Sequence, residues 1–458
     1  MSIFVSLSGN DTTGTGTILN PYLTWTKGLQ SASLGETVYV RGGTYTTTVS
    51  NPTGITFGTQ ESERITLMNY DGESVSLQPS AGSVCFQLKA DNASSATISY
   101  FTLSGLTFDG SNLAAASQAI VKIWNQAASD INNVIVDGCT LNNAPDHALQ
   151  IIGTAGGGGA TTCTIQNCTI LNPANNPGSE VNNNGMYLIG PNFVVQDNVV
   201  GYTITPQSGS NCIRLGASTD TETACTNGII RRNYVYGAKY GIILGKGNDM
   251  QCVNNLIRLG TATGTLGIQV WSSATLSTDN MKIYHNTLVH ASGMTHGIRG
   301  IGSGITNTLV RNNIIRRATT AIDLSGDTGT PVTTNNYTGT APGFANDGGT
   351  AIADYILTGT PATQDAGADL RSDVPTDFYG NTRDATPDQG FYELVVAAAP
   401  TVTVSAAYTA AVNVAYPLND GVVADVNNNT TYLDGVFDNV TTTVALAGSP
   451  GGTLTTRS

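Results

Sequence analysis

Asp146 and His147 are neighbouring residues whose types could do proton chemistry. A carboxylate beside an imidazole can orient the ring as a general base, and this pair stands at the head of a predicted strand, residues 148–151. A capping Asp followed by a turn His gives the same two letters, and that structural interpretation is the favoured one. Asp146 and His147 are therefore candidate catalytic residues with a structural alternative.

The motifs that identify several other chemistries are absent from the sequence. It contains no Gly-Xaa-Ser-Xaa-Gly elbow, no His-Glu-Xaa-Xaa-His helix, no phosphate-binding loop, and no EF-hand or nonapeptide calcium repeat. No set of metal ligands is predicted.

A short pattern of small, apolar, variable and apolar residues recurs from residue 148 to residue 324, as in Gly185-Met-Tyr-Leu188. Strand alternation places the two apolar positions inward and the variable position on the outer face. The variable positions are Gln150, Tyr187, Arg214, Ile243, Gln269, Arg299 and Asp323. This stripe is typical of a surface for an extended polar ligand, so Gln150, Tyr187, Arg214, Gln269 and Arg299 are candidate binding residues. The alternative is an ordinary solvated face.

Basic residues gather in one third of an acidic chain. Of the 19 Lys and Arg residues, 11 lie between Arg214 and Arg317, where only four acidic residues occur, for a local charge of +7. Three of the four histidines are there too, and His296 is the candidate for substrate binding. A positive patch would attract an anionic glycan. Alternatively, several of these arginines are solvated turn residues: Arg231, Arg232, Arg311, Arg316 and Arg317.

The elements that must position these residues are repeated coils. An apolar, any, small-or-Asn, Asn-or-Cys, any, apolar phrase occurs eight times, as in Val195-Gln-Asp-Asn-Val-Val200. Its fourth positions are Leu106, Cys139, Cys168, Asn198, Asn233, Asn255, Asn286 and Asn313, separated by 33, 29, 30, 35, 22, 31 and 27 residues. Such a drifting period is typical of a solenoid. The phrases alternate with a period of two, which excludes helical repeats and predicts a parallel β-helix.

The repeated asparagines predict a buried ladder. An Asn side chain at an interior turn can bond to the coils above and below it, which satisfies backbone groups that the turn leaves open. We expect Asn198, Asn233, Asn255, Asn286 and Asn313 to form one column. Cys139 and Cys168 are expected to continue that column as small buried hydrophobes.

Composition limits the class of protein. Of the 458 residues only 11% are charged, the net charge is −13, and no basic domain or nucleic-acid-binding module is present, which argues against a nucleic-acid partner. No apolar run is long enough to span a membrane. The first residues lack the basic segment and apolar core of an export signal, so either a signal was removed or the protein folds in the cytosol. The seven cysteines favour buried free thiols over a disulfide framework.

The N-terminal segment resembles a known superfamily. The residues that carry the resemblance are Phe4–Asp11, Asn20-Pro-Tyr22, an amphipathic stretch at 25–32, and Gly35–Tyr45. They are similar to the cap and first coil of right-handed β-helix proteins of the pectate-lyase-like superfamily, which includes polysaccharide lyases, hydrolases, epimerases and phage tailspikes. The end of the solenoid resembles the closing phrase of that group at Asp377–Arg383 and Asp388–Glu393. The resemblance implies a cap at 1–50 and a β-helix at 51–393.

The remaining residues predict a separate piece. Residues 394–400 are expected to form a linker, and residues 401–458 a small β module for attachment or oligomerisation. The module is predicted from alternation in Thr401–Ser405, Val412–Ala415 and Thr441–Leu446. A loosely ordered tail is the alternative.

The segment Ile242–Asp249 resembles the lysine segment of alginate and chondroitin lyases. In those enzymes the Lys removes the proton beside a uronate carboxylate, while an Arg and a calcium ion hold the substrate. The resemblance implies that Lys246 is the base. Tyr240 and Gly241 replace the expected acidic calcium ligands, and Trp271 stands near the expected Arg. Calcium therefore remains a possible cofactor for which no ligand motif is found.

The sequence leads to three functional hypotheses. The first is a phage virion protein of the tailspike or receptor-binding kind, made in the host cytoplasm and displayed on the virion. It would bind host polysaccharide along its flank, contact other virion proteins through the C-terminal module, and form a homotrimer. The second is a secreted polysaccharide lyase or epimerase that uses Lys246, His147 and Arg214 on a uronate glycan. The third is a structural virion decoration without enzymatic activity.

Overall fold

The computed structural model describes most of the chain before residue 395 and two strands beyond it. The described residues are 2–90, 97–114, 119–125, 129–153, 159–173, 183–203, 210–217, 224–260, 264–273, 275–394, and the backbone of 422–425 and 430–433. The chain divides into two compact units, Met1–Leu394 and Val395–Ser458. No helix in the described residues is long and apolar enough to cross a membrane.

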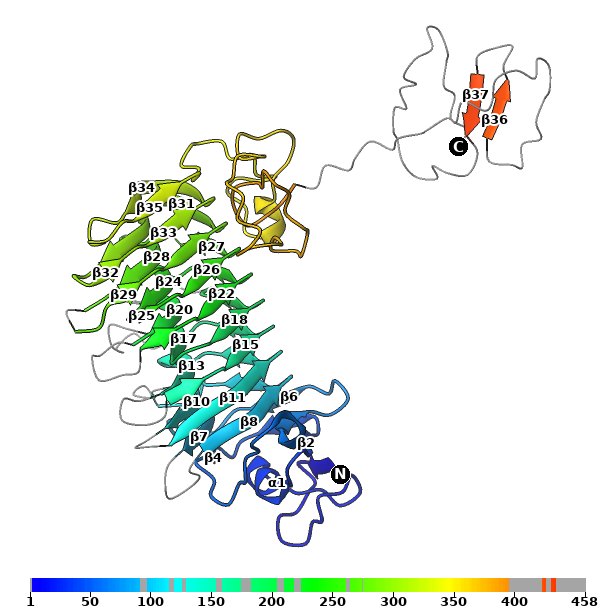
Figure 1. Ribbon diagram of the computed structural model, residues 1–458. Helices are drawn as coiled ribbons and strands as arrows, with labels where there is room; N and C mark the ends of the chain where they lie inside the picture. Colours follow the sequence, from blue (N-terminus) through cyan, green and yellow to red (C-terminus); the bar gives the residue numbers. More distant parts are fainter. Residues whose placement is uncertain are drawn as a thin grey trace. The chain divides into compact units, whose positions relative to one another are not determined.

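The first unit is a parallel β-helix whose wall has three faces (Figure 1). Face 1 is one continuous sheet in which each strand pairs in parallel with the strand of the next coil. Its strands are β1 (Ser2–Val5), β2 (Thr37–Val40), β5 (Ile65–Asn69), β8 (Thr97–Ser104), β11 (Asp130–Asp137), β15 (Thr164–Gln166), β18 (Val194–Gln196), β22 (Ile229–Arg231), β26 (Gln251–Val253), β30 (Lys282–Tyr284), β33 (Leu309–Arg311) and β35 (Val332–Thr334), with β14 (Gly159–Thr161) beside β11.

Faces 2 and 3 are two further series of parallel strands, which join in the long strands β31 (Thr287–Ile301) and β34 (Ile314–Asp323). Face 2 contains β3 (Gly43–Tyr45), β6 (Val75–Leu77), β9 (Thr107–Asp109), β12 (Thr140–Asn142), β16 (Thr169–Leu171), β19 (Val199–Gly201), β23 (Tyr234–Tyr236) and β27 (Leu256–Leu259). Face 3 contains β4 (Val49–Ser50), β7 (Phe86–Ala90), β10 (Ala119–Asn125), β13 (His147–Ile152), β17 (Asn184–Ile189), β20 (Asn211–Gly216), β24 (Tyr240–Gly245) and β28 (Leu266–Trp271). A short extra series holds β21 (Cys225–Thr226), β25 (Gly247–Asn248), β29 (Thr278–Asp279) and β32 (Ile305–Thr306).

The core forms because every coil sends apolar side chains inward at alternate positions. In β18, for example, Val195 is fully buried, and it pairs with Ile165 above and Ile230 below, which are buried too. Stacking in register therefore produces continuous columns of aliphatic side chains. All seven cysteines are free and buried, which confirms the prediction of free thiols.

The predicted asparagine ladder is confirmed. Asn198, Asn233, Asn255, Asn286 and Asn313 are each at most 1% exposed. The Nδ2 and backbone N–H groups of Asn255 both donate to Oδ1 of Asn286, at 2.9 and 3.0 Å, and Nδ2 also donates to the carbonyl of Ile230. The Cys168 N–H starts the column by donating to Asn198 Oδ1 at 2.9 Å. Asn336 closes it, and was missed because Thr333 and Thr338 replace the apolar ends of the phrase.

A left-handed residue precedes Cys168 and each ladder asparagine, in the turn between faces 1 and 2. These residues, with φ between 52° and 58°, are Asn167, Asp197, Arg232, Asn254, His285, Asn312 and Asn335. The two-residue turn needs positive φ at its first position, which Asn and Asp tolerate better than other side chains.

The N-terminal end of the stack is covered by helix α1 (Trp25–Ser31). Trp25 and Leu29 are buried in the core, and Gly28 lies so close to Val5 that a Cβ would be 2.6 Å from the Val5 Cγ2 atom. The Thr24 side chain caps the helix by accepting the N–H of Lys27. A short 3-10 helix, η1 (Glu61–Glu63), lies in the connection between the early coils.

The last part of the unit folds back over the coils instead of adding new ones. After β35 the chain forms a 3-10 helix, η2 (Ile352–Tyr355), and irregular segments that contact the outside of earlier strands. The Tyr234 hydroxyl donates to the carbonyl of Thr350, and Lys282 pairs with Asp373 at 2.8 Å. This arrangement was not predicted from the sequence, in which the β-helix was expected to extend to residue 393.

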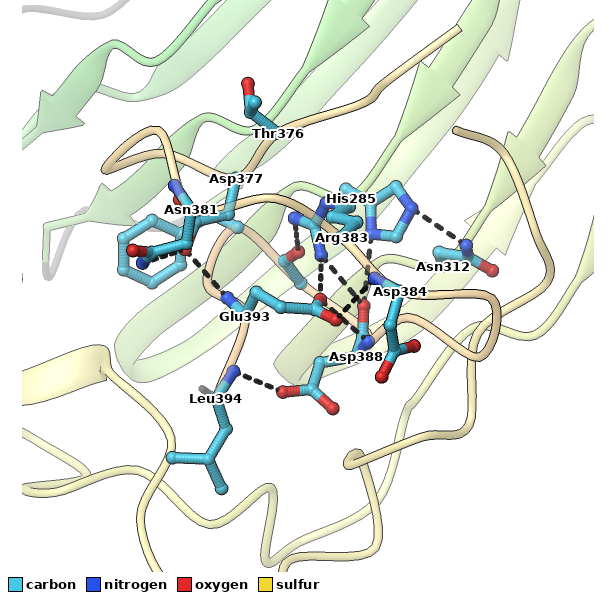
Figure 2. Close-up of polar contacts among 12 residues, drawn as sticks. His285, Asn312, Thr376, Asp377, Asn381, Arg383, Asp384, Asp388, Glu393 and Leu394 are labelled. Atoms are coloured by element: carbon cyan, nitrogen blue, oxygen red, sulfur yellow. Dashed lines mark hydrogen bonds and ion pairs between the residues drawn. The ribbon is translucent and has the colours of Figure 1, made fainter. Parts of the chain in front are cut away.

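A buried polar network fixes the closing segment, residues 376–394 (Figure 2). Arg383, 1% exposed, donates to Glu393 Oε2 at 2.7 Å, to Asn254 Oδ1 at 2.9 Å and to the carbonyl of Gly390. Asp377 accepts the backbone N–H of Glu393. The predicted closing phrase therefore locks onto the turn residues of the β-helix.

In the second unit the structure describes one antiparallel pair, β36 (Val422–Asp425) and β37 (Thr430–Leu433). The stretches Thr401–Ser405, Val412–Ala415 and Thr441–Leu446, on which the β module was predicted, lie outside the described residues, as does the linker after Leu394.

Candidate functional site

The variable stripe forms one outward column along face 3, and its predicted register is confirmed. Neighbouring coils pair residue for residue through the whole stripe. The pairs are Lys122–Gln150, Gln150–Tyr187, Tyr187–Arg214, Arg214–Ile243, Ile243–Gln269, Gln269–Arg299 and Arg299–Asp323.

A second outward column lies two residues further along the same strands. It runs from Trp124 through Ile152 and Ile189, and continues below with Gly216, Gly245, Trp271 and Ile301. The two glycines leave a space beside the Trp271 ring. A Cβ atom at Gly245 would lie 3.3 Å from Trp271 Cε3, and one at Gly216 would collide with the Gly245 carbonyl. The indole therefore lies over backbone that carries no side chain.

Two cations from different coils meet at this indole. Lys246 Nζ lies 4.4 Å from the Trp271 ring centroid, and Arg214 Cζ lies 5.4 Å from it. Arg214 Cζ is also 5.5 Å from the ring of Tyr187. We call Tyr187, Arg214, Lys246 and Trp271 the cation–aromatic row. Contacts of this length between a cation and a ring face are attractive, and more so when water is excluded.

The backbone holds both cations in place. Lys246 follows β24 with a φ of 51°, and its N–H donates to the Trp271 carbonyl and to Thr278 Oγ1, both at 3.0 Å. Arg214 donates from Nε to the Gly216 carbonyl and from Nη2 to the Ala217 carbonyl. The row is thus built from β17, β20 and β28 and from the residue that follows β24.

The cation–aromatic row is more covered than an ordinary outer face. Lys246 is 2% exposed, Arg214 6% and Tyr187 7%. The alternative of an ordinary solvated face therefore does not describe Arg214. Its side chain lies outside the aliphatic core, yet little of it reaches water.

A similar group lies five coils upstream and was missed by the sequence analysis. Lys122 Nζ is 4.7 Å and Lys89 Nζ is 5.1 Å from the ring of Trp124. We call Lys89, Lys122 and Trp124 the upstream group. Burial lowers the pKa of Lys122. The signal was present in Val121-Lys-Ile-Trp124, which has the apolar, variable, apolar pattern of the later copies.

Asp146 and His147 do not form the arrangement of a general-base dyad. His147 Nδ1 accepts the buried Asn184 N–H at 3.0 Å, so this nitrogen cannot also donate a proton to Asp146, whose Oδ1 is 3.4 Å away. Burial, with help from Arg214 and Lys122, lowers the pKa of His147 to about 3. The imidazole is neutral and weakly basic, as the structural alternative requires. The role of Asp146 as its orienting partner is corrected accordingly.

The predicted positive patch between Arg214 and Arg317 is partly neutralised in the fold. Acidic residues outside positions 214–317 form ion pairs with the cations inside that range. The ion pairs are Arg232–Asp197, Lys282–Asp373, Arg299–Asp323, Arg316–Asp347 and Arg317–Asp347. The net local charge counted along the sequence therefore overstated the positive potential of this region.

Arg299 and His296 share one carboxylate at the far end of the stripe. Asp323 lies 3.4 Å from Arg299 Nε and 3.6 Å from His296 Nε2. Burial and the charge of Arg299 lower the pKa of His296, against the effect of Asp323. Gln269 separates these residues from the cation–aromatic row and is partly exposed.

The residues that are described do not fit a carboxylate calcium site. None of their His, Cys, Asp and Glu side chains come together in a group of three that could hold a metal ion. Beside Lys246 the strand carries Tyr240 and Gly241, which offer no carboxylate.

The match of a family model agrees with this architecture. Residues 3–188 match the family model of the Pel9A-like right-handed β-helix region. Among solved structures, pectate lyase Pel9A is 14% identical, with 86% of this chain and 96% of that chain covered and a TM-score of 0.49. XylC in complex with xylose is 13% identical (70% and 69% covered, TM-score 0.49), and PfbA, a surface adhesin of Streptococcus pneumoniae, is 13% identical (67% and 84% covered, TM-score 0.45).

A search of the curated proteins gives no match. The fold and the family-model match define a right-handed parallel β-helix protein with the pectate-lyase-like fold.

Proposed function

We propose that this protein binds an anionic polysaccharide along the outward side of face 3, with the cation–aromatic row at the centre of the site. The observation that carries the proposal is the single indole of Trp271 between Lys246 and Arg214. An aromatic face packs against the C–H face of a sugar ring, and a neighbouring cation attracts a carboxylate or sulfate substituent. Together these groups match a charged sugar unit.

The spacing of the two groups supports an extended ligand. Trp124 and Trp271 lie in one column, five coil steps apart, which corresponds to about 24 Å along the axis. Gln150 and Tyr187 lie in the adjacent column between them, and Gln150 Oε1 is buried with no hydrogen-bond partner in the described part of the chain. A glycan parallel to the axis would extend from the upstream group, past this amide, to the row.

A second candidate function is cleavage of the same glycan by β-elimination. This function is favoured because Lys246 and Arg214 both lie against the ring of Trp271. Lys246 would take the proton from the carbon beside a uronate carboxylate while Arg214 balances the carboxylate charge. The electron pair then forms the C=C bond as the glycosidic C–O bond breaks, and the leaving oxygen takes a proton from water. An epimerase would return the proton to the opposite face instead.

The location on a virion surface is a proposal from the sequence alone. On this hypothesis the protein is a homotrimeric tailspike or receptor-binding protein, and its second unit attaches it to other virion proteins. A secreted extracellular protein is the alternative, and a purely structural decoration is the third hypothesis. The mass of the native assembly distinguishes a trimer from a monomer.

The function is tested by titrating the protein with acidic and neutral oligosaccharides while the absorbance of unsaturated uronates is followed in the ultraviolet. Binding of acidic oligosaccharides with no new absorbance supports a binding protein, and time-dependent absorbance supports a lyase. Absence of any binding to acidic oligosaccharides would contradict both.

A further inference from the structure

The outer face of face 1 carries a cluster of aromatic rings at its N-terminal end. The rings of Phe4, Tyr39 and Tyr70 contact one another, with centroid distances of 5.4–5.5 Å. Phe4 pairs with Tyr39 in the strand register, while Val5, Val38 and Val40 on the opposite side of the strands are buried in the core. The three rings therefore point outward, and each is only partly buried.

A hollow of about 450 Å³ lies beside these rings. Its walls are Tyr39, Met68, Asn69, Tyr70, Asp71 and Gly72. Asp71 and Gly72 form a tight turn after β5, with φ values of 49° and 71°, which the Glu73 N–H closes by donating to the Tyr70 carbonyl. The turn brings the exposed Asp71 carboxylate to the rim of the hollow.

Three polar groups at this hollow are uncommitted within the described residues, whereas the Asn69 amide donates to the Glu73 carbonyl at 3.0 Å. Neither the hydroxyls of Tyr39 and Tyr70 nor the Asp71 carboxylate has a hydrogen-bond partner there, whereas the buried Tyr45 hydroxyl donates to the Arg41 carbonyl at 2.9 Å. Two hydroxyls and a carboxylate beside aromatic ring faces offer hydrogen bonds and apolar contact in the same small volume.

The charges around the hollow exclude an anionic ligand. Arg41 is the nearby cation, and it is bound by Glu73, with Nη2 at 2.9 Å from Oε1 and Nε at 3.0 Å from both carboxylate oxygens. The guanidinium also lies over the Tyr70 ring, 5.1 Å from its centroid. The charged side chain that lines the hollow is then Asp71, which repels carboxylates and accepts hydroxyl protons.

We propose that this hollow binds an uncharged sugar unit, at a site separate from the cation–aromatic row and of opposite electrostatic character. The sugar ring packs on the tyrosine faces and its hydroxyls bond to Asp71 and to the two phenols. The two sites lie on different faces of the same β-helix, so one protein would hold a neutral and an acidic glycan, or two kinds of unit of one glycan.

The test is calorimetric titration of the full chain with neutral cello-, xylo- and manno-oligosaccharides. Tyr39→Ala and Tyr70→Ala should weaken binding about tenfold or more. Asp71→Asn should weaken it several-fold without disturbing the fold, because Asn tolerates the left-handed backbone. Tyr379→Ala is the matched control, since Tyr379 is 51% exposed and packs against Phe378 and Tyr392 in another aromatic cluster.

The salt dependence of binding distinguishes this hollow from the cation–aromatic row. Neutral-sugar binding should be unchanged from about 50 mM to about 500 mM sodium chloride, and should survive Lys246→Gln. No binding of any neutral oligosaccharide, or equal losses in Tyr70→Ala and Tyr379→Ala, would overturn the proposal. If the protein binds neutral oligosaccharides but no acidic ones, only the proposed function of the row is overturned.

Discussion

The ammonium nitrogen of Lys246 lies 4.4 Å from the centre of the Trp271 ring, although the two residues belong to successive coils. This contact exists because Gly245 pairs with Trp271 and leaves the ring room to lie beside the lysine. The stacking of coils, more than any local motif, therefore assembles the candidate site.

The ladder asparagines should be essential for stability. Asn255→Leu removes donors to Asn286 and to the Ile230 carbonyl, and each buried group left unpaired costs about 1–3 kcal/mol. Urea denaturation should show a lower free energy of unfolding. Asn336→Leu, at the open end of the ladder, should cost less. Equal stability of Asn255→Leu and the wild type would refute the ladder as a stabilising element.

The closing segment should depend on its buried ion pair. Arg383→Ala leaves Glu393 buried without its cation, and such losses amount to about 3–5 kcal/mol. The control is Arg371→Ala, which breaks an exposed pair with Asp369 and should change little. The outcome is measured as the melting temperature and as the rate of proteolytic cleavage after residue 375. Similar melting of both variants would mean that the network does not hold the segment.

Stability should fall as the pH drops below about 6.5, the ordinary pKa of histidine. The buried His285 donates from Nδ1 to the Asp388 carbonyl and accepts the Asn312 amide at Nε2, so only the neutral ring fits. Burial and Arg383 hold its pKa well below the usual value. A group with a depressed folded-state pKa takes its proton in the unfolded state first, which favours unfolding.

His147 adds to this slope, since its pKa is lowered to about 3. Burial raises the pKa of Asp388 and of Glu393. These carboxyl groups oppose the loss of stability at low pH, but only in the pH range where carboxylates titrate. The comparison is the free energy of unfolding at pH 7.5 and at pH 5.5 for the wild type and His285→Asn. A variant with the same pH dependence as the wild type would exclude His285 as the cause.

The thiols should be unreactive in the native protein. All seven are buried, and burial raises the pKa of Cys139 and of Cys163 to about 12. Ellman's reagent should therefore detect seven thiols in denaturant and almost none beforehand. Fewer than seven in non-reducing denaturant would reveal a disulfide and contradict the structure.

The solenoid, the ladder and the register of the stripe were predictable because each depends on a local pattern repeated in every coil. Asn198 and Asn233 occupy the same position in successive copies of the phrase, and this shared position predicted that their side chains stack. Period-two alternation likewise placed Tyr187 beside Arg214.

Relations between distant segments left no such pattern. Asp347 and Asp373 neutralise Arg316 and Lys282 only because the end of the unit folds back over the coils. The proton position on His147 depends on Asn184, which belongs to the next coil. Charge counted along the sequence and adjacency of Asp146 to His147 were therefore poor guides to electrostatics and to acid–base roles.

The most direct test of the proposed site is the affinity of three proteins for one acidic oligosaccharide: the wild type, Lys246→Gln and Lys239→Gln. Lys239 precedes β24, Lys246 follows it, and Lys239 also lies over a ring, 5.5 Å from the centroid of Tyr240. We predict that Lys246→Gln weakens binding about tenfold or more and reduces its salt dependence, while Lys239→Gln binds as the wild type does. Equal affinities for all three proteins, with unchanged melting temperatures, would contradict an anionic-glycan site at the cation–aromatic row.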